Sequence, residues 1–333
     1  MNRPAPHSIQ QYGSSLRKQF SLDVLVGLSA SQKFLPAKYF YDAQGSKIFR
    51  DICDCDDYYL TDCEFDVLRT RGQEIVASLS ADAVDVIELG AGDGRKTKVL
   101  LSLLEAAGKS FSYMPVDISE SAVDELVESM RADYPNMDIV GFVGEYFDGM
   151  RQMGINLEPS RPRLVMFLGS NIGNFEHREA MRFLRAIWDN LRDGDYLLVG
   201  FDLKKDIEVM LKAYNDPEGH TRDFNLNLLR RINDELGGQF DLNKFCHYGF
   251  YNPWRGTMES YLVSRESQDV QISALNRQFH FDAFEGIHME YSTKYLQKDV
   301  DSMAAHAGFS VVNHWQDSKG WFMDSLWQVR KGA

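Results

Sequence analysis

Cysteine is scarce in this sequence, with four residues among 333. A disulfide-stapled extracellular protein has more cysteines in a shorter chain, so this class is disfavoured. Three of the four cluster at Cys53, Cys55 and Cys63, but their spacing fits no zinc-binding pattern. The eight histidines include no His-x-x-x-His pair. We therefore expect reduced, structural thiols and no metal site.

The sequence also lacks an apolar run of the roughly 20 residues that a membrane span needs. Residues 1–11 are polar and have no apolar signal core. An excess of basic charge is missing as well, because 36 basic residues face 49 acidic ones and the formal net charge is −13. Nucleic-acid binding draws on a basic face. We expect a cytoplasmic protein, a monomer, with no membrane or nucleic-acid partner.

An alternation of strand-like and helix-like segments runs from about residue 70 to residue 203. Short β-rich apolar runs such as AVDVIELG and SYMPVDIS each precede an amphipathic stretch. Strands that alternate with helices indicate parallel strands joined by crossover helices. The pattern predicts an α/β fold with a doubly wound, Rossmann-like sheet.

The alternation of strand-like and helix-like segments ends after Leu203, where two helical stretches lead into extended, aromatic-rich segments. A helix and two strands then return at the carboxyl end. We expect an N-terminal helical segment and a cofactor-binding domain in residues 1–203, completed by residues 293–333. Residues 204–292 would form an inserted α+β domain.

A glycine-rich loop, Glu88-Leu89-Gly90-Ala91-Gly92-Asp93-Gly94, follows the first strand and precedes a helix. Glycine lets a backbone turn sharply and approach a ligand closely. The dinucleotide pattern expects another glycine at position 95, where this chain has Arg95. An acidic residue two before the first glycine is typical of S-adenosylmethionine (SAM) loops, where it borders the methionine part. The loop favours a methyltransferase over an NAD-dependent oxidoreductase.

Further polar residues stand where the next two strands are expected to end. Asp117 suits the ribose hydroxyls of a nucleoside cofactor, and Glu145 and Tyr146 suit an adenine amine and ring. Asp117 as a helix cap and the other two as solvated residues are the alternatives. The three strand ends are expected to meet in one cleft.

Several longer motifs resemble those of a known protein family. They are KYFYDAQGSKIF, DDYYLTDCE, IELGAGDGRKT, FLGSNIGNF, AYNDPEGHTRDFN and GIHMEYSTKY, in this order. From Phe34 to Val329 the sequence resembles the histidine-specific, SAM-dependent methyltransferases of ergothioneine biosynthesis, which trimethylate the α-amino group of histidine to hercynine. The resemblance implies a class I methyltransferase fold in which residues 204–292 bind the substrate, a small amino acid.

The resemblance also implies site residues. Tyr41 would be catalytic and border the methyl donor. The cofactor would contact Phe49, Glu88, Gly90, Gly92, Lys96, Asp117, Glu145, Tyr146 and Gly169. The amino-acid carboxylate would be held by Asn174 and Tyr214, and the imidazole by Tyr58, Glu290 and Ser292. A carboxylate beside a ring nitrogen selects an imidazole and its tautomer.

Each assignment has a plainer alternative. Tyr58 could be a core aromatic, Asn174 a turn or cap residue, and Glu290 a solvent-facing strand residue. Asn171 replaces an expected threonine, and Ser260 stands where an apolar residue is expected beside the imidazole. These departures keep open α-N-methylation of another amino acid such as tryptophan, and a catalytically silent binding module is a third possibility.

Overall fold

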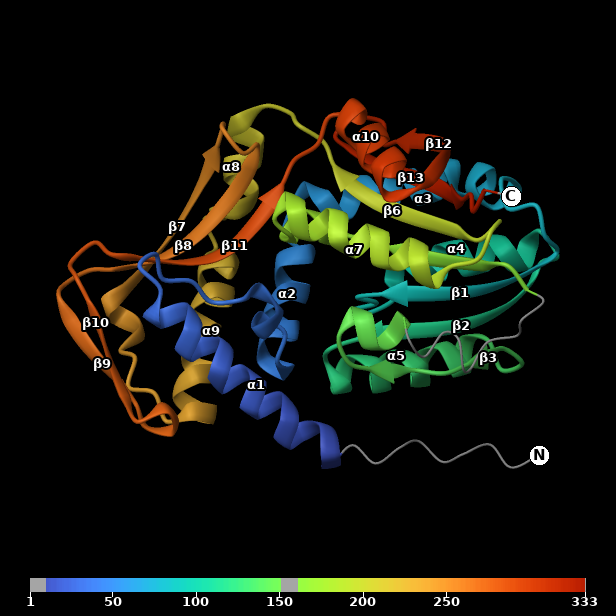
Figure 1. Cartoon of the computed structure of the whole chain (residues 1–333). Helices are drawn as coiled ribbons and strands as arrows, with labels where there is room; N and C mark the ends of the chain where they lie inside the picture. Colours follow the sequence, from blue (N-terminus) through green and yellow to red (C-terminus); the bar gives the residue numbers. More distant parts are fainter. Residues whose placement is uncertain (1–9, 151–160, 333) are drawn as a thin grey trace.

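The structure, a computed structural model, describes residues 10–150 and 161–332, with side chains from Arg17 onward. Two lobes lie side by side (Figure 1). One is built around a large twisted sheet, and the other carries smaller sheets and long helices. Among the described residues, no helix is long and apolar enough to cross a membrane.

The large sheet is the doubly wound sheet that the alternating pattern predicts. Its strand order is β12-β13-β6-β5-β1-β2-β3, with β4 also paired to β2. The strands are β1 (Ala83–Leu89), β2 (Ser110–Asp117), β3 (Asp138–Ile139), β4 (Phe142–Val143), β5 (Arg163–Phe167), β6 (Tyr196–Asp202), β12 (Phe309–Gln316) and β13 (Phe322–Val329). The pairs from β3 to β6 are parallel, whereas β13 runs antiparallel to both β6 and β12. The order reverses beside β1, where open α/β sheets bind their ligands.

Helices cover both faces of this sheet because its strands are apolar on both sides. Along β1, Val86 belongs to one buried cluster and Ile87 to the other, as alternation requires. The first face is covered by α3 (Tyr59–Ala77), α4 (Arg95–Ala106) and α5 (Glu120–Asp133), and the second by α7 (His177–Asn190) and α10 (Gln297–Ala307). The buried residues of α7 include Ala180, Phe183, Leu184 and Ile187, the spacing of an apolar helix stripe.

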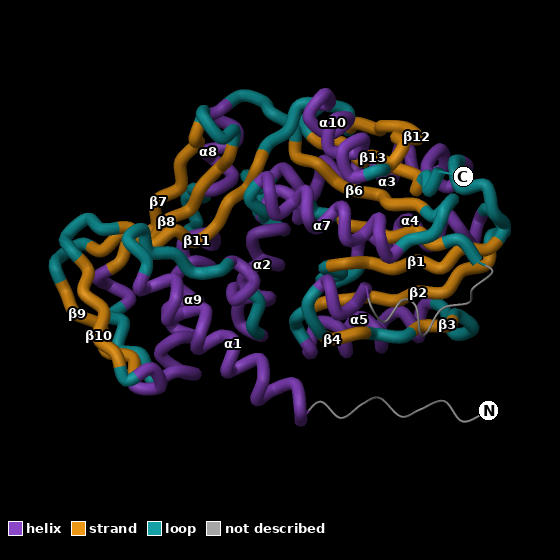
Figure 2. The backbone as a smooth tube through the Cα atoms, in the orientation of Figure 1, coloured by secondary structure: helices purple, strands orange, loops and turns teal. Residues whose placement is uncertain are grey.

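The second lobe contains the inserted residues (Figure 2). Its helices are α8 (Ile207–Tyr214) and α9 (His220–Leu236). Its strands are β7 (Phe245–Asn252), β8 (Thr257–Ser264), β9 (Gln268–Ile272), β10 (Arg277–Phe281) and β11 (Gly286–Thr293). They form an antiparallel sheet of order β11-β8-β7 and the hairpin β10-β9.

The N-terminal helices pack against this lobe. They are α1 (Gln10–Ser29), the 3-10 turn η1 (Ala37–Phe40) and α2 (Ala43–Cys53). One buried cluster joins residues of α1 and α2, such as Val24 and Ile52, to Phe224 of α9 and Ile287 of β11. In packing terms, the second lobe is therefore built from two distant segments of the chain. Domain boundaries at residues 203/204 and 292/293 remain a proposal.

Candidate active site

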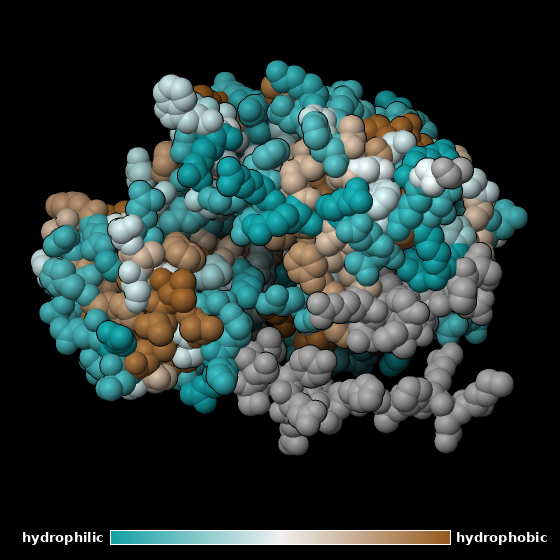
Figure 3. All heavy atoms as spheres, viewed as in Figure 1, coloured by the Kyte–Doolittle hydropathy of each residue, from teal (hydrophilic) through white to brown (hydrophobic). Residues whose placement is uncertain are grey.

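A cavity of about 1230 Å³ lies between the two lobes, at the hollow seen in Figure 3. On one side it is lined by residues at the carboxyl ends of β1, β2 and β5, and on the other by residues of α2 and β11. All but two of the site residues expected from the sequence line it: Tyr41, Phe49, Tyr58, Glu88, Gly90, Gly92, Lys96, Asp117, Glu145, Tyr146, Gly169, Asn174 and Glu290. The roles expected of them remain predictions.

The glycine loop has the backbone conformation that its sequence predicts. Gly90, Gly92 and Gly94 all have positive φ angles, of +74°, +54° and +68°, a region that other residues rarely adopt. A β-carbon at Gly90 would lie 3.0 Å from the amide nitrogen of Asn171 and 3.1 Å from the Tyr146 hydroxyl, whereas one at Gly92 would meet nothing within 4 Å. The loop leaves room for a ligand that approaches its backbone.

Asp117 ends β2 and points to the same loop. Its carboxylate accepts hydrogen bonds from the backbone N–H of Gly92, at 3.1 Å, and of Ser119, at 3.0 Å. Burial raises the pKa of Asp117, and these N–H groups oppose that rise. The carboxylate lines the cavity and has lone pairs left for further donors.

Glu88 lines the cavity but is only 3% exposed. Its carboxylate accepts hydrogen bonds from the hydroxyls of Thr97 and Tyr113, and burial raises its pKa to about 7. These bonds tie the start of α4 to β1 and β2. Glu88 therefore stabilises the conformation of the glycine loop from the buried side of the loop.

Lys96 points into the cavity and pairs with Glu64, a fully buried carboxylate of α3. Glu64 also accepts the backbone N–H of Gly169, with both oxygens 2.9 Å away. This bond holds the turn after β5, where Gly169 has a φ of +73° and Ser170 one of +55°. No role was predicted for Glu64, because its partners lie over 30 residues away along the chain.

Glu145 is half of an ion pair with Lys38, with 2.8 Å between the ammonium and a carboxylate oxygen. Lys38 also lies 3.2 Å from Asp23 of α1, so the pair links the two lobes at the edge of the cavity. Lys38 is a second residue that sequence reasoning missed. The predicted contact of Glu145 with adenine stays a prediction.

Aromatic rings form one wall of the cavity. Phe49 meets Tyr41 and Tyr58 edge-on, with ring centroids 5.4 and 6.4 Å away. The ring of Phe224 lies behind Tyr41 and Phe49, at 5.5 and 5.6 Å. Burial raises the pKa of the Tyr41 hydroxyl well above its ordinary value, so this hydroxyl stays neutral at physiological pH. Such a wall suits an apolar or cationic group.

Two polar side chains from different elements complete the lining of the cavity. Asn174 ends the 3-10 turn η2 (Asn171–Asn174) after β5, and no hydrogen bond among the described residues uses its amide. Glu290 of β11 likewise has no side-chain donor among them. Burial raises the pKa of Glu290 to about 7, and the charge of Lys294 opposes that rise. Both groups are free to meet a ligand.

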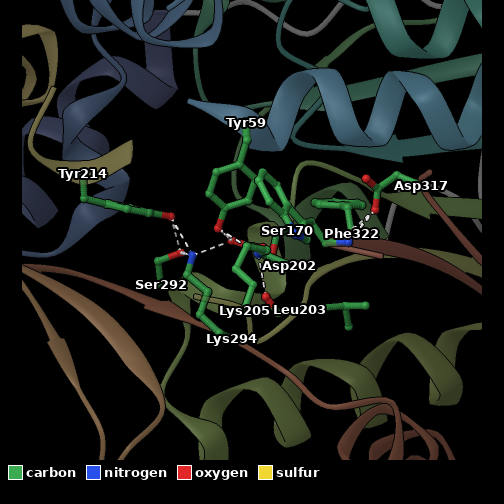
Figure 4. Close-up of polar contacts among 11 residues, drawn as sticks. Tyr59, Ser170, Asp202, Leu203, Lys205, Tyr214, Ser292, Lys294, Asp317 and Phe322 are labelled. Atoms are coloured by element: carbon green, nitrogen blue, oxygen red, sulfur yellow. Dashed lines mark hydrogen bonds and ion pairs between the residues drawn. The ribbon is translucent and has the colours of Figure 1, made fainter. Parts of the chain in front are cut away.

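Tyr214 and Ser292 do not line the cavity. Their hydroxyls lie 2.6 Å apart, and each is 2.8 Å from the ammonium of Lys294 (Figure 4). The Tyr214 ring packs edge-on behind Tyr58, which does line the cavity, at 6.2 Å. The structure thus places this pair one layer behind the wall. Lys294 belongs to the GIHMEYSTKY motif, but the sequence motif predicted no role for it.

Ser260 is paired directly with Glu290 across β8 and β11 and is 2% exposed. Opposite residues of an antiparallel pair have β-carbons about 5 Å apart. The side chain of Ser260 is therefore a neighbour of Glu290. It is small and polar, where the family resemblance implies an apolar residue. Asn171 lies beside Gly90 and Gly169 in the turn after β5.

The chain is similar to several known proteins. The model of a family described as "Histidine-specific methyltransferase, SAM-dependent" matches residues 20–329. A histidine N-alpha-methyltransferase of Mycolicibacterium smegmatis is 36% identical over 91% of this chain and 93% of its own. Ergothioneine biosynthesis protein 1 of Neurospora crassa is 29% identical over 84% of this chain and 32% of its own. Among solved structures, a magnesium protoporphyrin IX methyltransferase of Synechocystis PCC 6803 aligns with a TM-score of 0.44 and 14% identity, over 89% of this chain and 98% of its own.

Proposed function

From the premise that the chain belongs to the family of histidine-specific, SAM-dependent methyltransferases, we propose that it methylates the α-amino nitrogen of L-histidine. The chain is an enzyme that uses SAM, and its relatives are named for histidine methylation and ergothioneine biosynthesis. We propose the trimethylated product, hercynine, and a place in that pathway. This family membership also disfavours the NAD-dependent oxidoreductase alternative.

One observation carries the proposal: a single cavity joins the strand ends of the large sheet to Glu290 and Asn174. A methyl transfer needs donor and acceptor in one enclosed space, with the two reacting atoms in line. The glycine loop and Asp117 offer a nucleoside site on one side. Across from them, Asn174 and Glu290 offer an amide and a carboxylate to an amino acid.

The residues fit SAM. The loop from Gly90 to Gly94 leaves its backbone open at Gly92, and Asp117 suits two ribose hydroxyls. The other residues proposed for this contact are Phe49, Glu88, Lys96, Glu145, Tyr146 and Gly169. When bound, SAM supplies an activated methyl group on a sulfonium. The protein therefore needs no metal and no strong base to create an electrophile.

The chain positions the acceptor amine and excludes water from it. The amine must be neutral to attack, and an α-amino pKa near 8 leaves a usable neutral fraction at physiological pH. Tyr41 is the proposed catalytic residue: its hydroxyl oxygen can accept a hydrogen bond from an N–H of the primary or secondary amine and so orient the amine lone pair. In each of the first two transfers one proton leaves the methylated nitrogen for the solvent before the next attack, and the third transfer gives a quaternary cation and releases no proton.

Three further side chains are proposed to bind histidine. Glu290 accepts a hydrogen bond from an imidazole N–H, and the Tyr58 ring covers the imidazole. Asn174 donates its amide N–H to the α-carboxylate. Tyr41, Phe49 and Tyr58 would tolerate the growing trimethylammonium, since aromatic faces attract quaternary cations.

The test is a product survey. The protein is incubated with SAM and each of the twenty amino acids, and mass spectrometry follows gains of one, two or three methyl groups. Trimethylated histidine as the main product is expected. A preference for tryptophan would support the alternative acceptor class, and reduction of NAD with no methyl transfer would overturn the proposal. Gel filtration of the same sample tests the expected monomer, and added nucleic acid should leave the elution unchanged.

A further inference from the structure

Lys38 of the 3-10 turn η1 lines the cavity, and the proposed chemistry does not use it. Its ammonium lies 2.8 Å from a carboxylate oxygen of Glu145 and 3.2 Å from one of Asp23. An ammonium has three hydrogens and no acceptor. Two of them are committed to these carboxylates, and no further acceptor for the third occurs among the described residues. Lys38 can therefore still donate one hydrogen bond to a ligand in the cavity.

Glu145 likewise keeps an unused oxygen. Its Oε1 atom accepts from Lys38, whereas no donor in the part of the chain that the structure describes reaches Oε2. Asp23 differs, because its two oxygens already accept hydrogen bonds from Gln19 and from the Tyr39 hydroxyl, at 2.7 and 2.6 Å. Asp23 therefore anchors the ammonium from α1. The pair of Lys38 and Glu145 offers a ligand one donor and one acceptor side by side.

This ion pair belongs to the half of the cavity that is proposed for the nucleoside. The backbone N–H of Gly144 donates to the carbonyl of Asp117 at 2.9 Å, so Glu145 directly follows a residue that is bonded to the end of β2. Asp117 is the residue proposed for the ribose hydroxyls, and Lys38, Asp117 and Glu145 line one cavity. The donor and the acceptor of the ion pair are therefore available to the base of the same nucleoside.

Adenine matches this donor and acceptor. Its amino group is a donor, and the ring nitrogens that flank the amino group are bare acceptors. Deamination turns the amino group into a carbonyl, so hypoxanthine would place an oxygen against the carboxylate of Glu145. Burial alone would lower the pKa of Lys38, but Glu145 and Asp23 raise it above its ordinary value, so the ammonium keeps its hydrogens at physiological pH.

We propose that Lys38 is a further cofactor-binding residue, which donates to a ring nitrogen of the SAM adenine while Glu145 accepts from the amino group. The pair thereby selects an adenine nucleoside over a hypoxanthine nucleoside. Asp23 holds the ammonium in place and so makes helix α1 part of the cofactor site. The inference rests on the proposed function, because it concerns SAM in the same cavity.

The experiment measures binding with two ligands. They are S-adenosylhomocysteine (SAH), which is SAM without the transferred methyl group, and its deaminated analogue S-inosylhomocysteine. Lys38→Met removes the ammonium, and in calorimetric titration its Kd for SAH should rise about tenfold, the lower end of the range for a hydrogen bond to a charged group. Its Kd for S-inosylhomocysteine should change little, so the preference for adenine falls.

Arg50→Met is the matched control. Arg50 also lines the cavity and joins the two lobes through an ion pair with Glu125, at 3.5 Å. Its guanidinium makes no ion pair with Glu145. Arg50→Met should therefore keep the wild-type preference for SAH over S-inosylhomocysteine.

A second arm tests the donated hydrogen bond itself. In two analogues of SAH, a carbon replaces one or the other of the ring nitrogens that flank the amino group. One of these analogues should bind the wild type about tenfold more weakly than SAH does, whereas Lys38→Met should bind that analogue and SAH equally. Lys38→Arg keeps the charge and the donors and should retain much of the preference. If Lys38→Met does not fold, Lys38→Gln removes the charge, and the same fall in preference is expected.

Three results would overturn the inference: a wild type that binds SAH and S-inosylhomocysteine equally, an equal loss of affinity for both in Lys38→Met, or an equal loss of preference in Arg50→Met. A wild type that shows the preference but methylates an amino acid other than histidine overturns the proposed function alone. A wild type that binds neither ligand in calorimetry overturns both.

Discussion

At the scale of single residues, Glu290 combines a place on the cavity wall with a pKa of about 7. Near neutral pH both of its protonation forms are present. The ionised form accepts a hydrogen bond from an imidazole N–H, and the protonated form donates one to the bare ring nitrogen. An indole ring has an N–H but no second, basic nitrogen. We therefore expect Glu290 to discriminate among aromatic amino acids.

Glu290→Ala should lower kcat/KM for histidine by about tenfold to a hundredfold, the range for a hydrogen bond to a charged group. With tryptophan the relative rate should rise, because the larger ring gains space and a buried carboxylate is removed. Measuring kcat/KM for both substrates in wild type and variant gives a ratio that must move toward tryptophan. Equal losses on both would make Glu290 a residue of the fold.

Glu290 also predicts how stability depends on pH. Its folded-state pKa of about 7 lies above the ordinary value of 4.5, so the folded state binds the proton more tightly than the unfolded chain. The contribution of Glu290 to the free energy of unfolding is therefore fully present below about pH 4.5. It is lost as the pH rises from there through the folded-state pKa of about 7. Glu290→Gln should flatten the fall in Tm across this window, with the higher Tm at the alkaline end. Glu128→Gln, at an exposed position of α5, should follow the wild-type curve, and a parallel curve for Glu290→Gln would contradict the raised pKa.

The sequence predicted the residues at the ends of strands better than their partners. Asp117 and Gly90 were recognisable because a polar residue or a glycine directly after a β-rich run lies at the edge of a parallel sheet. Lys38, Glu64 and Lys294 were missed. Each acts through a partner that is distant along the chain, and no local spacing reports such a pairing.

At the scale of elements, the glycine loop sets how closely a ligand can approach β1. Gly90→Ala and Gly108→Ala form a matched pair, since their φ angles are +74° and +70°. An alanine at either position costs about 1–2 kcal/mol of backbone strain. At Gly108 nothing lies within 4 Å, whereas at Gly90 the new methyl meets Asn171 and Tyr146.

Both variants should therefore lose stability, Gly90→Ala somewhat more because of these contacts, but only Gly90→Ala should weaken SAM binding in calorimetric titration. Full affinity in Gly90→Ala would show that no ligand approaches this backbone.

The prediction of strands from the sequence was less accurate around residues 139–147. One strand was expected there, and the structure has β3 and β4 of two residues each, because Gly141 and Gly144 interrupt the run.

At the scale of the whole molecule, the aromatic wall of the cavity stands on the core of the second lobe. Phe224 is 3% exposed and supports Tyr41 and Phe49. Phe224→Ala should cost about 3–5 kcal/mol of stability and should also lower methylation well below the Tm, because the wall loses its support. Phe309→Ala, at a buried ring packed on Trp327 and outside the cavity lining, should lose stability alone. Equal activities in the two variants would contradict this coupling.

The layout of the lobes could be predicted only in part. Alternating segments up to Leu203 and the change of rhythm after it predict a doubly wound sheet and an α+β insertion. The packing of α1 and α2 against the insertion was not foreseen, because an amphipathic helix shows that it has an apolar face but not which distant surface covers it. Val24 and Ile287 are over 260 residues apart in the chain yet share one cluster.

That shared cluster imposes an order on biosynthesis. When the ribosome releases the first helices, the surface that covers Val24 and Ile52 has not yet been translated. At about 5–20 residues per second, the strand that contains Ile287 follows roughly 10–50 seconds later. During this interval the nascent chain exposes apolar side chains that a chaperone can hold. The large sheet is completed later still, because β12 and β13 are translated after β11. The first helices and the inserted segment therefore complete one lobe shortly before the carboxyl-terminal strands complete the other.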